Sequence, residues 1–167
     1  MTQKKTPGLA LLLLLIPVAG CESPPPEIPE APPTQPVAVE RVEVSTPDAP
    51  EAIGPYSQAV LAGSTLYLAG QIALDPATGE MVQGGIEAET HQVMANLGAV
   101  LEAAGFSFDD VVQSQVFLTD LDEFQTMNGI YGQYLSDPYP ARATVQVAAL
   151  PRGARVEIQL VAWQGDP

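Results

Sequence analysis

The sequence contains one cysteine, one histidine and no lysine after Lys5. One cysteine excludes a disulfide framework within the chain, and together with one histidine it leaves no His/Cys cluster for a zinc or iron site. The sequence also lacks a P-loop, an EF-hand spacing and a glycine-rich dinucleotide fingerprint. We therefore expect no metal and no cofactor, and any chemistry should come from ordinary side chains.

Positive charge is scarce as well. The 167 residues carry 20 acidic and 6 basic side chains, and two of the basic ones, Lys4 and Lys5, lie in a segment that we expect to be removed. The remaining chain has four arginines against 20 acids, a charge of −16 before the termini are counted. Such a surface repels phosphate backbones, so nucleic acid is not an expected partner.

The first twenty residues have the pattern of a secretory signal peptide. A lysine-containing start precedes an apolar run over 9–16, which is shorter than the roughly 20 residues of a bilayer-spanning helix. The sequence Val-Ala-Gly-Cys at 18–21 resembles the bacterial lipobox, whose cysteine is acylated and becomes the mature N-terminus. We predict a signal peptide over 1–20 and a lipid anchor on Cys21, on the extracytoplasmic side of a bacterial cell envelope. The alternative is a plain secretory signal with an incidental cysteine.

Proline is concentrated in the next segment. Residues 22–50 hold nine of the 17 prolines in a stretch otherwise rich in glutamate and alanine, which cannot bury a core and favours extended polyproline conformation. We predict a tether over 21–44, with a partner-binding proline motif as the alternative. The folded domain is assigned to 45–165, and its first structured residues are expected near Val42.

The rest of the chain predicts one α+β domain. Apolar periodicity and turn residues give the order β-β-α-β-α-β-β, with two helices covering one face of a sheet. The first helix is predicted over 85–104 with Gly105 as its cap, and the second should open at an Asp120/Glu123 capping box with Phe124, Met127, Tyr131 and Tyr134 inward. The strands are predicted at 59–62, 65–69, 111–118, 142–148 and 155–163, the last two joined as a hairpin through 150–153.

Alternation in the last two strands predicts an apolar and a polar face of the sheet. The polar face would carry Arg142, Thr144, Gln146, Glu157 and Gln159, and the apolar face would carry Ala143, Val145, Val147, Val156, Ile158, Leu160 and Ala162.

Arg142 is the first candidate for binding a ligand. It is one of three arginines after Pro47, and its guanidinium can bind a carboxylate through two parallel hydrogen bonds. An ion pair with a nearby acid is the alternative. In a hairpin register Glu157 would lie roughly 13 Å away, so the two side chains could flank a bound molecule. Glu157 is then a candidate acid/base or water-positioning group, or simply a solvated carboxylate.

Three further residues carry weaker signals. Tyr56 follows Gly54-Pro55 in a loop, where it could close over a ligand or pack on the domain edge. Asn128 lies on the second helix, where asparagine usually faces water. His91 lies off the apolar stripe of the first helix and is given no role.

Four parts of the domain carry a recognisable pattern, namely 52–59 (AIGPYSQA), 70–72 (GQI) with 75–79 (DPATG), 116–120 with 124–128, and 140–157. In these stretches the domain resembles the RidA (YjgF-like) reactive intermediate deaminase family, and the resemblance covers about 45–165. The resemblance implies a chorismate-mutase-like fold, a homotrimer with ligand sites between subunits, and cofactor-independent hydrolysis of enamines and imines. The substrates would be of the 2-aminoacrylate or 2-iminopropanoate type, and the products 2-keto acids and ammonia.

The resemblance also implies roles for single residues. Arg142 would bind the substrate carboxylate, Glu157 would position or activate water, and Tyr56 would close over the ligand. The cleft would be lined by Asn128 and by the backbone around Gly70 and Thr144.

Two positions depart from the family pattern, because Ala69 stands where serine is frequent and Thr144 where cysteine is common. A non-catalytic binder of small carboxylates, or a chaperone-like envelope protein, is the alternative function. The ribonuclease activity sometimes attached to the family name is disfavoured by the negative charge and by the absence of a histidine pair.

Overall fold

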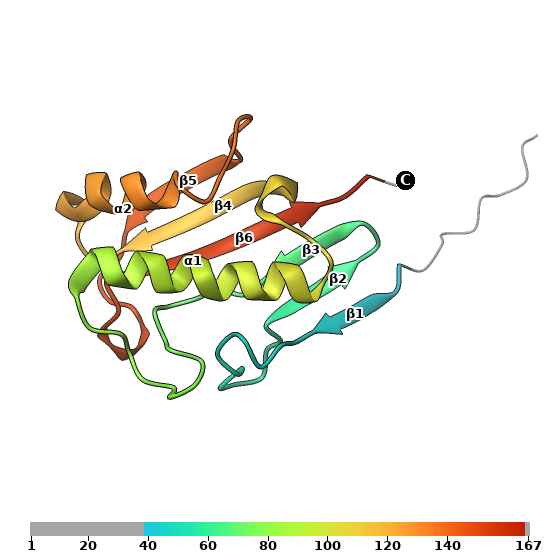
Figure 1. Ribbon diagram of the computed structural model, residues 1–167, viewed down its shortest axis with the longest axis horizontal. Coiled ribbons are helices and arrows are strands. Elements are labelled where there is room, and N and C mark those ends of the chain that lie inside the picture. The colour runs from blue at the N-terminus through green and yellow to red at the C-terminus, as the bar shows by residue number, and fades with distance from the viewer. Residues whose placement is uncertain (1–38, 166–167) are drawn as a thin grey trace, which may run out of the picture. The chain divides into compact units, whose positions relative to one another are not determined.

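A six-stranded sheet with two helices on one face organises residues 39–165, the part of the chain that the computed structural model describes (Figure 1). The strands are β1 (Arg41–Val44), β2 (Ala59–Ala62), β3 (Thr65–Leu68), β4 (Val111–Leu118), β5 (Ala141–Gln146) and β6 (Val156–Trp163), and the helices are α1 (Gly85–Ala103) and α2 (Phe124–Tyr131). Three 3-10 turns, η1 (Phe108–Asp110), η2 (Leu121–Glu123) and η3 (Pro151–Gly153), complete the elements. Cys21, the predicted signal peptide and most of the predicted tether lie outside the described residues.

Strand β1 begins the sheet. It pairs antiparallel with β2, with Val44 opposite Ala59, which agrees with the expected start of structure near Val42. Residues 41–44, which the domain division gave to the tether, are therefore part of the sheet. Within 39–165 no helix is long and apolar enough to cross a membrane.

The strand order is β1-β2-β3-β6-β4-β5, which corrects the predicted hairpin of the last two strands. β4 lies between β5 and β6, parallel to the first and antiparallel to the second. The parallel pair follows from the β4–α2–β5 connection, because a crossover through a helix returns the chain in the same direction. β6, with four buried apolar residues, occupies the middle of the sheet between β3 and β4.

The helix α1 confirms the predicted apolar stripe. Its buried residues include Ile86, Val93, Leu97, Val100 and Leu101, and the chain leaves the helix through Gly105 at a φ of 78°. A positive φ at this position favours glycine, which has no Cβ to collide with the preceding turn.

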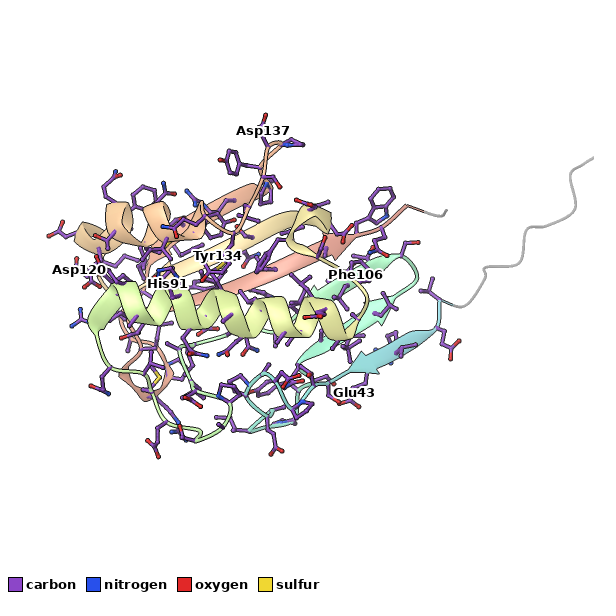
Figure 2. All side chains as sticks on the ribbon, in the orientation of Figure 1. Glu43, His91, Phe106, Asp120, Tyr134 and Asp137 are labelled. Atoms are coloured by element: carbon purple, nitrogen blue, oxygen red, sulfur yellow. The ribbon has the colours of Figure 1, made fainter. Side chains whose placement is uncertain are left out.

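The start of α2 differs from the predicted capping box. The Asp120 side chain accepts a hydrogen bond from the Asp122 N–H at 2.9 Å, as a cap should. The reciprocal bond from Glu123 is not formed, because its carboxylate pairs with Arg155 at 2.7 Å. The helix ends at Tyr131, so Tyr134 lies beyond it, half-buried, with its hydroxyl 2.9 Å from Nδ1 of exposed His91 (Figure 2).

The facing of β5 is opposite to the prediction. Its residues Arg142, Thr144 and Gln146 pair with Ser114, Val116 and Leu118, which are buried beneath the helices. The three polar side chains therefore share the helix-covered face, and Ala143 and Val145 lie on the opposite one. For β6 the prediction is confirmed, since Val156, Ile158, Leu160 and Ala162 are buried and Glu157 alternates with them. We call the face opposite the helices the uncovered face.

Candidate functional site

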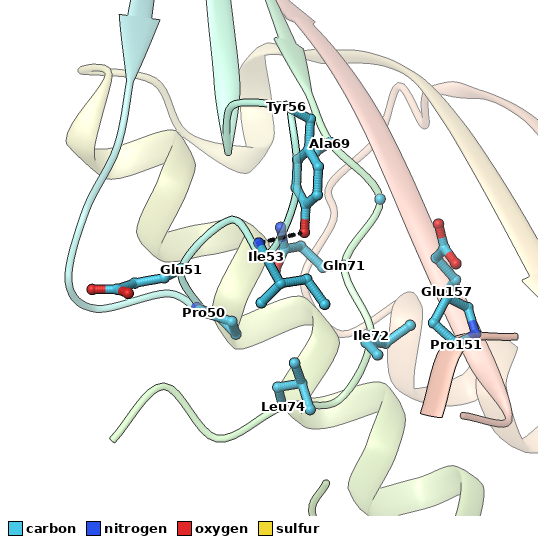
Figure 3. A pocket seen from close by; sticks show the side chains of 11 residues that line it. Pro50, Glu51, Ile53, Tyr56, Ala69, Gln71, Ile72, Leu74, Pro151 and Glu157 are labelled. Atoms are coloured by element: carbon cyan, nitrogen blue, oxygen red, sulfur yellow. Dashed lines mark hydrogen bonds between the residues drawn. The ribbon is translucent and has the colours of Figure 1, made fainter. Parts of the chain in front are cut away.

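A cavity of about 350 Å³ lies beside Glu157, and we refer to it as the Glu157 cavity (Figure 3). It is lined by Pro50, Glu51, Ile53, Tyr56, Ala69, Gly70, Gln71, Ile72, Leu74, Pro151 and Glu157. Figure 3 shows Tyr56 and Ile53 on one side, and Glu157, Ile72 and Pro151 on the other. The structure thus brings together three predicted site residues, namely Tyr56, Gly70 and Glu157.

Glu157 is half-buried on β6, and this burial raises the pKa of its carboxyl group because desolvation disfavours the charged form. Its carboxylate lies directly against the backbone of Gly70, where an added methyl group would overlap it. The Gly70 N–H and C=O make no hydrogen bond to any described residue. The absence of a Cβ at Gly70 therefore allows the carboxylate to approach the backbone closely.

Tyr56 lies in a loop whose first residues are bonded to the side chain of Gln58. The Tyr56 hydroxyl accepts a hydrogen bond from the Ile53 N–H at 3.3 Å (Figure 3), and the side chain remains 48 % exposed. The buried Gln58 amide donates to the carbonyls of Thr46, Ala49 and Pro50 at 2.8 to 3.1 Å, and its oxygen accepts from the Thr46 N–H. These hydrogen bonds fix both ends of the loop that contains Tyr56.

The opposite wall of the cavity is fixed by Asn96 of α1. Its amide is buried and donates to the carbonyl oxygens of Ile72, at 3.3 Å, and Leu74, at 2.9 Å. Its own oxygen accepts from Gln92 at 2.9 Å. The wall is therefore anchored to the helix rather than left as a free loop.

A second cavity, of about 520 Å³, surrounds Arg142 and is called the Arg142 cavity below. It is lined by Asn128, Tyr131, Gly132, Tyr139, Pro140 and Arg142. Asn128 is half-buried at its edge, so the prediction that Asn128 lies near Arg142 agrees with the structure.

The Arg142 guanidinium lies against aromatic rings. Its central carbon is 4.8 Å from the ring centre of Tyr131 and 5.7 Å from that of Phe124. Among residues 39–165 it makes no ion pair; the two that occur join Arg155 to Glu89 and to Glu123. The ion-pair alternative is therefore not what the structure contains, and the exposed guanidinium keeps its donors for a ligand.

Tyr131 is itself held by a buried partner. Its hydroxyl shares a hydrogen bond of 2.7 Å with the Ser114 hydroxyl on β4. Burial raises the pKa of Tyr131, against the effects of Ser114 and Arg142, so the hydroxyl stays protonated at neutral pH. The ring beneath Arg142 is thus fixed in place by the sheet.

Thr144 lies two residues beyond Arg142 on the same face, but it does not line the Arg142 cavity. Its hydroxyl oxygen is buried and has no hydrogen-bond partner among the described residues. In the part of the chain that the structure covers, no group of three or more His, Cys, Asp or Glu side chains is placed to hold a metal ion.

The two cavities do not meet within one chain. Arg142 pairs with Ser114 and Glu157 with Phe117, so they lie two strand spacings and three residues apart, roughly 14 Å at about 4.8 Å per strand and 3.3 Å per residue. They also lie on opposite faces, Arg142 beneath α2 and Glu157 on the uncovered face. The prediction that they share one face and flank one molecule is wrong for a single chain.

Sequence reasoning missed the residues that support the site. Gln58 and Asn96 act on backbone carbonyls at least eight residues away, and Tyr131 was assigned only to the helix core. Tyr139, 62 % exposed beside Arg142, lies in a loop that gave no pattern. A buried polar residue inside an apolar helix stripe, as at Asn96, was the one usable signal.

Comparison with known proteins places this geometry in a family. The family model described as Endoribonuclease L-PSP matches residues 46–164. A 2-iminobutanoate/2-iminopropanoate deaminase of Bos taurus is 52 % identical over 122 residues, which are 73 % of this chain and 89 % of that protein.

Solved structures agree with the fold. RidA from an Antarctic Psychrobacter species has 48 % sequence identity and a TM-score of 0.71, over 74 % of this chain and 99 % of that one. TdcF of E. coli, solved with bound serine, has 37 % identity and a TM-score of 0.71 over the same shares. The predicted α+β fold with two helices on one face is thereby confirmed, and the chain belongs to the RidA/endoribonuclease L-PSP family.

Proposed function

We propose that this protein is a cofactor-independent deaminase that hydrolyses enamines and imines of the 2-aminoacrylate or 2-iminopropanoate type to 2-keto acids and ammonia. The observation that carries the proposal is the pairing of an unneutralised guanidinium, at Arg142, with a desolvated carboxyl group, at Glu157, in a relative of named deaminases. The formal charge of −14 disfavours RNA as a substrate, despite the family's name.

The chemistry requires one bound anion and one proton carrier. Arg142 holds the substrate carboxylate through two parallel hydrogen bonds, which fixes the imine carbon. The Glu157 carboxylate accepts a proton from water as the water oxygen bonds to that carbon, and it returns this proton to the imine nitrogen, which gives a carbinolamine. It then accepts the proton of the carbinolamine hydroxyl as the C=O bond forms and passes it to the nitrogen, so that the C–N bond breaks and ammonia leaves.

The two cavities act together when subunits meet, and we place the site at the interfaces of a homotrimer. The Arg142 cavity of one subunit would face the Glu157 cavity of the next, which brings the guanidinium and the carboxylate to one ligand. Tyr56 would close over that ligand, with Asn128 and the backbone at Gly70 and Thr144 beside it.

The uncovered face supports assembly. Large apolar side chains lie on it without cover, including Tyr67, 51 % exposed, and Val145, 45 % exposed, with half-buried Phe117 and Val161 between them. Apolar surface of this kind, next to a site that one chain leaves incomplete, is typical of a protein–protein interface.

The expected ligand is similar in size and charge to a molecule bound by a related protein. TdcF was solved with bound serine, an amino acid that carries the same carboxylate next to its reacting carbon. A guanidinium with free donors is the group that would bind such a carboxylate in this chain.

The test is the rate of 2-iminopropanoate hydrolysis by the full-length protein beside Arg142→Ala. We expect the variant to lose at least about 100-fold in kcat/KM, because a charged hydrogen-bonded pair is removed. Arg41→Ala is the matched control, since Arg41 is exposed on β1 and lines neither cavity. Saturable binding of 2-ketobutyrate without turnover would identify a non-catalytic carboxylate-binding protein instead.

We also propose that Cys21 is acylated and holds the protein to a membrane, on the extracytoplasmic side of a bacterial cell envelope. The support is the sequence alone: a charged start, an apolar run too short to span, and the run of small residues before the cysteine. Mass spectrometry of the mature N-terminus tests this. Diacylglyceryl-cysteine at position 21, lost in Cys21→Ser, is expected, whereas an intact or differently cleaved N-terminus would contradict it.

A further inference from the structure

The Glu157 cavity is larger than the smallest imino acids require. At about 350 Å³ it lies within the range of roughly 300–1,000 Å³ that encloses whole drug-sized ligands. In the site proposed above, the carboxylate of 2-iminopropanoate lies at Arg142 of the neighbouring subunit. Only one methyl group then extends beyond the carbon that water attacks, and it fills a small part of the volume that the cavity has in a single chain.

Most of the side chains that line the cavity are apolar. They are Pro50, Ile53, Ala69, Ile72, Leu74 and Pro151, and we call this set the apolar wall. Leu74 is 6 % exposed and Ile72 is half-buried, and the carbonyl oxygens of both are held by Asn96. The apolar wall is therefore preformed, and a ligand need not spend binding energy on ordering it.

The charged residues that line the cavity are both acidic. Glu157 and Glu51 contribute carboxylates, and within residues 39–165 no basic side chain lines the cavity. A ligand side chain with its own carboxylate would meet repulsion and find no cation to pair with. The cavity therefore accepts apolar groups and excludes anionic ones.

We infer that the Glu157 cavity is a side-chain subsite that selects 2-imino acids with bulky apolar side chains, such as isobutyl and benzyl groups, over those with methyl or carboxyalkyl groups. The inference rests on the proposed deaminase function and deepens it. It names the substrate class as the imines of branched-chain and aromatic amino acids.

The expected preference follows from the apolar surface that the ligand buries. Each methylene group moved from water into an apolar site contributes about 0.8 kcal/mol, or about fourfold. An isobutyl group has three more carbons than a methyl group. We expect kcat/KM for the leucine-derived imine to exceed that for the alanine-derived imine by at least about tenfold.

The experiment uses the full-length protein and four imines, which an L-amino-acid oxidase forms in place from alanine, leucine, phenylalanine and glutamate. The rate of 2-keto acid release is measured against the uncatalysed rate. Leucine- and phenylalanine-derived imines should be hydrolysed fastest and the glutamate-derived imine slowest. Equal rates, or a preference for the alanine-derived imine, would overturn the inference, whereas no hydrolysis of any imine would contradict the proposed function itself.

Substitutions in the wall sharpen the test. Ile72→Ser should lower the ratio of leucine-derived to alanine-derived kcat/KM by about tenfold, because a small polar hydroxymethyl group replaces an apolar sec-butyl group. Leu121→Ser is the matched control, since Leu121 is 44 % exposed on η2 and lines no part of the cavity; it should leave the ratio unchanged.

A second variant guards against misfolding of the first. Ile53 lines the same wall but is 69 % exposed, so folding does not depend on it, and Ile53→Ser should lower the ratio in the same direction. If Ile72→Ser and Ile53→Ser both leave the ratio at the wild-type value, the wall does not contact the substrate side chain and the inference is wrong.

Discussion

The Glu157 cavity and the Arg142 cavity differ in how far each buries its charged side chain. Glu157 is half-buried among mostly apolar side chains, and desolvation raises the pKa of its carboxyl group. Arg142 is exposed, and its guanidinium lies over the rings of Tyr131 and Phe124. A proton carrier benefits from a raised pKa, whereas a carboxylate-binding cation needs open donors in a fixed orientation.

The difference also explains why one chain keeps the two groups apart. A guanidinium within about 4–6 Å of Glu157 would favour the ionised carboxylate and lower its pKa. The Glu157 carboxylate would also accept the guanidinium hydrogen bonds that a substrate carboxylate needs. With the two side chains on opposite faces of the sheet, each property is established separately, and in the proposed site they combine where subunits meet around a ligand.

The largest expected effect comes from removing the proton carrier. Glu157→Gln should lower kcat about 10²- to 10⁴-fold, because general acid–base catalysis contributes in that range. Binding of 2-ketobutyrate should persist, since Arg142 is intact; calorimetry beside the kinetics tests this. If binding of 2-ketobutyrate were lost together with kcat, Glu157 would take part in binding the carboxylate and the two cavities would not have separate roles.

The same variant should not lose stability at neutral pH. The pKa of Glu157 is raised in the folded state, so its ionised form destabilises the fold above that pKa, and this effect disappears as the pH falls through it. The neutral amide removes the effect. Denaturant unfolding at pH 7 should therefore give an equal or higher free energy of unfolding for Glu157→Gln than for wild type.

A smaller change should displace the carboxylate without removing it. Gly70→Ala places a methyl group where the Glu157 carboxylate lies, and that flexible side chain must move. We expect kcat to fall at least about tenfold, while the free energy of unfolding changes by less than about 1 kcal/mol. Gly129→Ala is the control, because a Cβ on this exposed residue of α2 meets no atom within 4 Å and activity should be unchanged.

The pH dependence should distinguish the cavities. kcat should fall about tenfold per unit as the pH drops below the raised pKa of Glu157, because the protonated carboxyl cannot accept a proton from water. Binding of 2-ketobutyrate should stay constant over the same range, because arginine remains charged. A parallel loss of kcat and binding would contradict separate roles.

The smallest effect concerns the support of Arg142. Tyr131→Phe keeps the ring beneath the guanidinium but removes the hydroxyl bonded to Ser114, a change of about 1 kcal/mol. We expect KM to rise about fivefold with little change in kcat. Tyr134→Phe, which removes the hydroxyl bonded to His91, should leave KM as it is; equal KM values in the two variants would show that the Ser114 bond does not orient Arg142.

Local structure was predictable because its signals are local. The stripe of α1, its Gly105 cap, and the extents of β2 and β4 follow from spacing and turn residues within each segment. The positions of β5 and β6 in the sheet were not predictable in this way. The short connection between them suggested a hairpin, whereas in the structure β4 lies between them and pairs with both.

The facing of β5 shows a second limit. Alternation told which residues share a face, but Val145 was assigned to the core on hydrophobicity alone. It lies instead on the uncovered face, where exposed apolar side chains are typical of a protein–protein interface. For the site, scarcity and family resemblance found Arg142 and Glu157. The networks of Gln58 and Asn96 depend on carbonyl groups that only the fold brings near.

The most direct measurement of the central claim mixes two inactive variants. Arg142→Ala and Glu157→Gln subunits, co-assembled in equal amounts, should recover about one quarter of wild-type activity if each site takes its arginine from one subunit and its glutamate from the next. Activity that stays at the level of the separate variants would contradict a site shared between subunits.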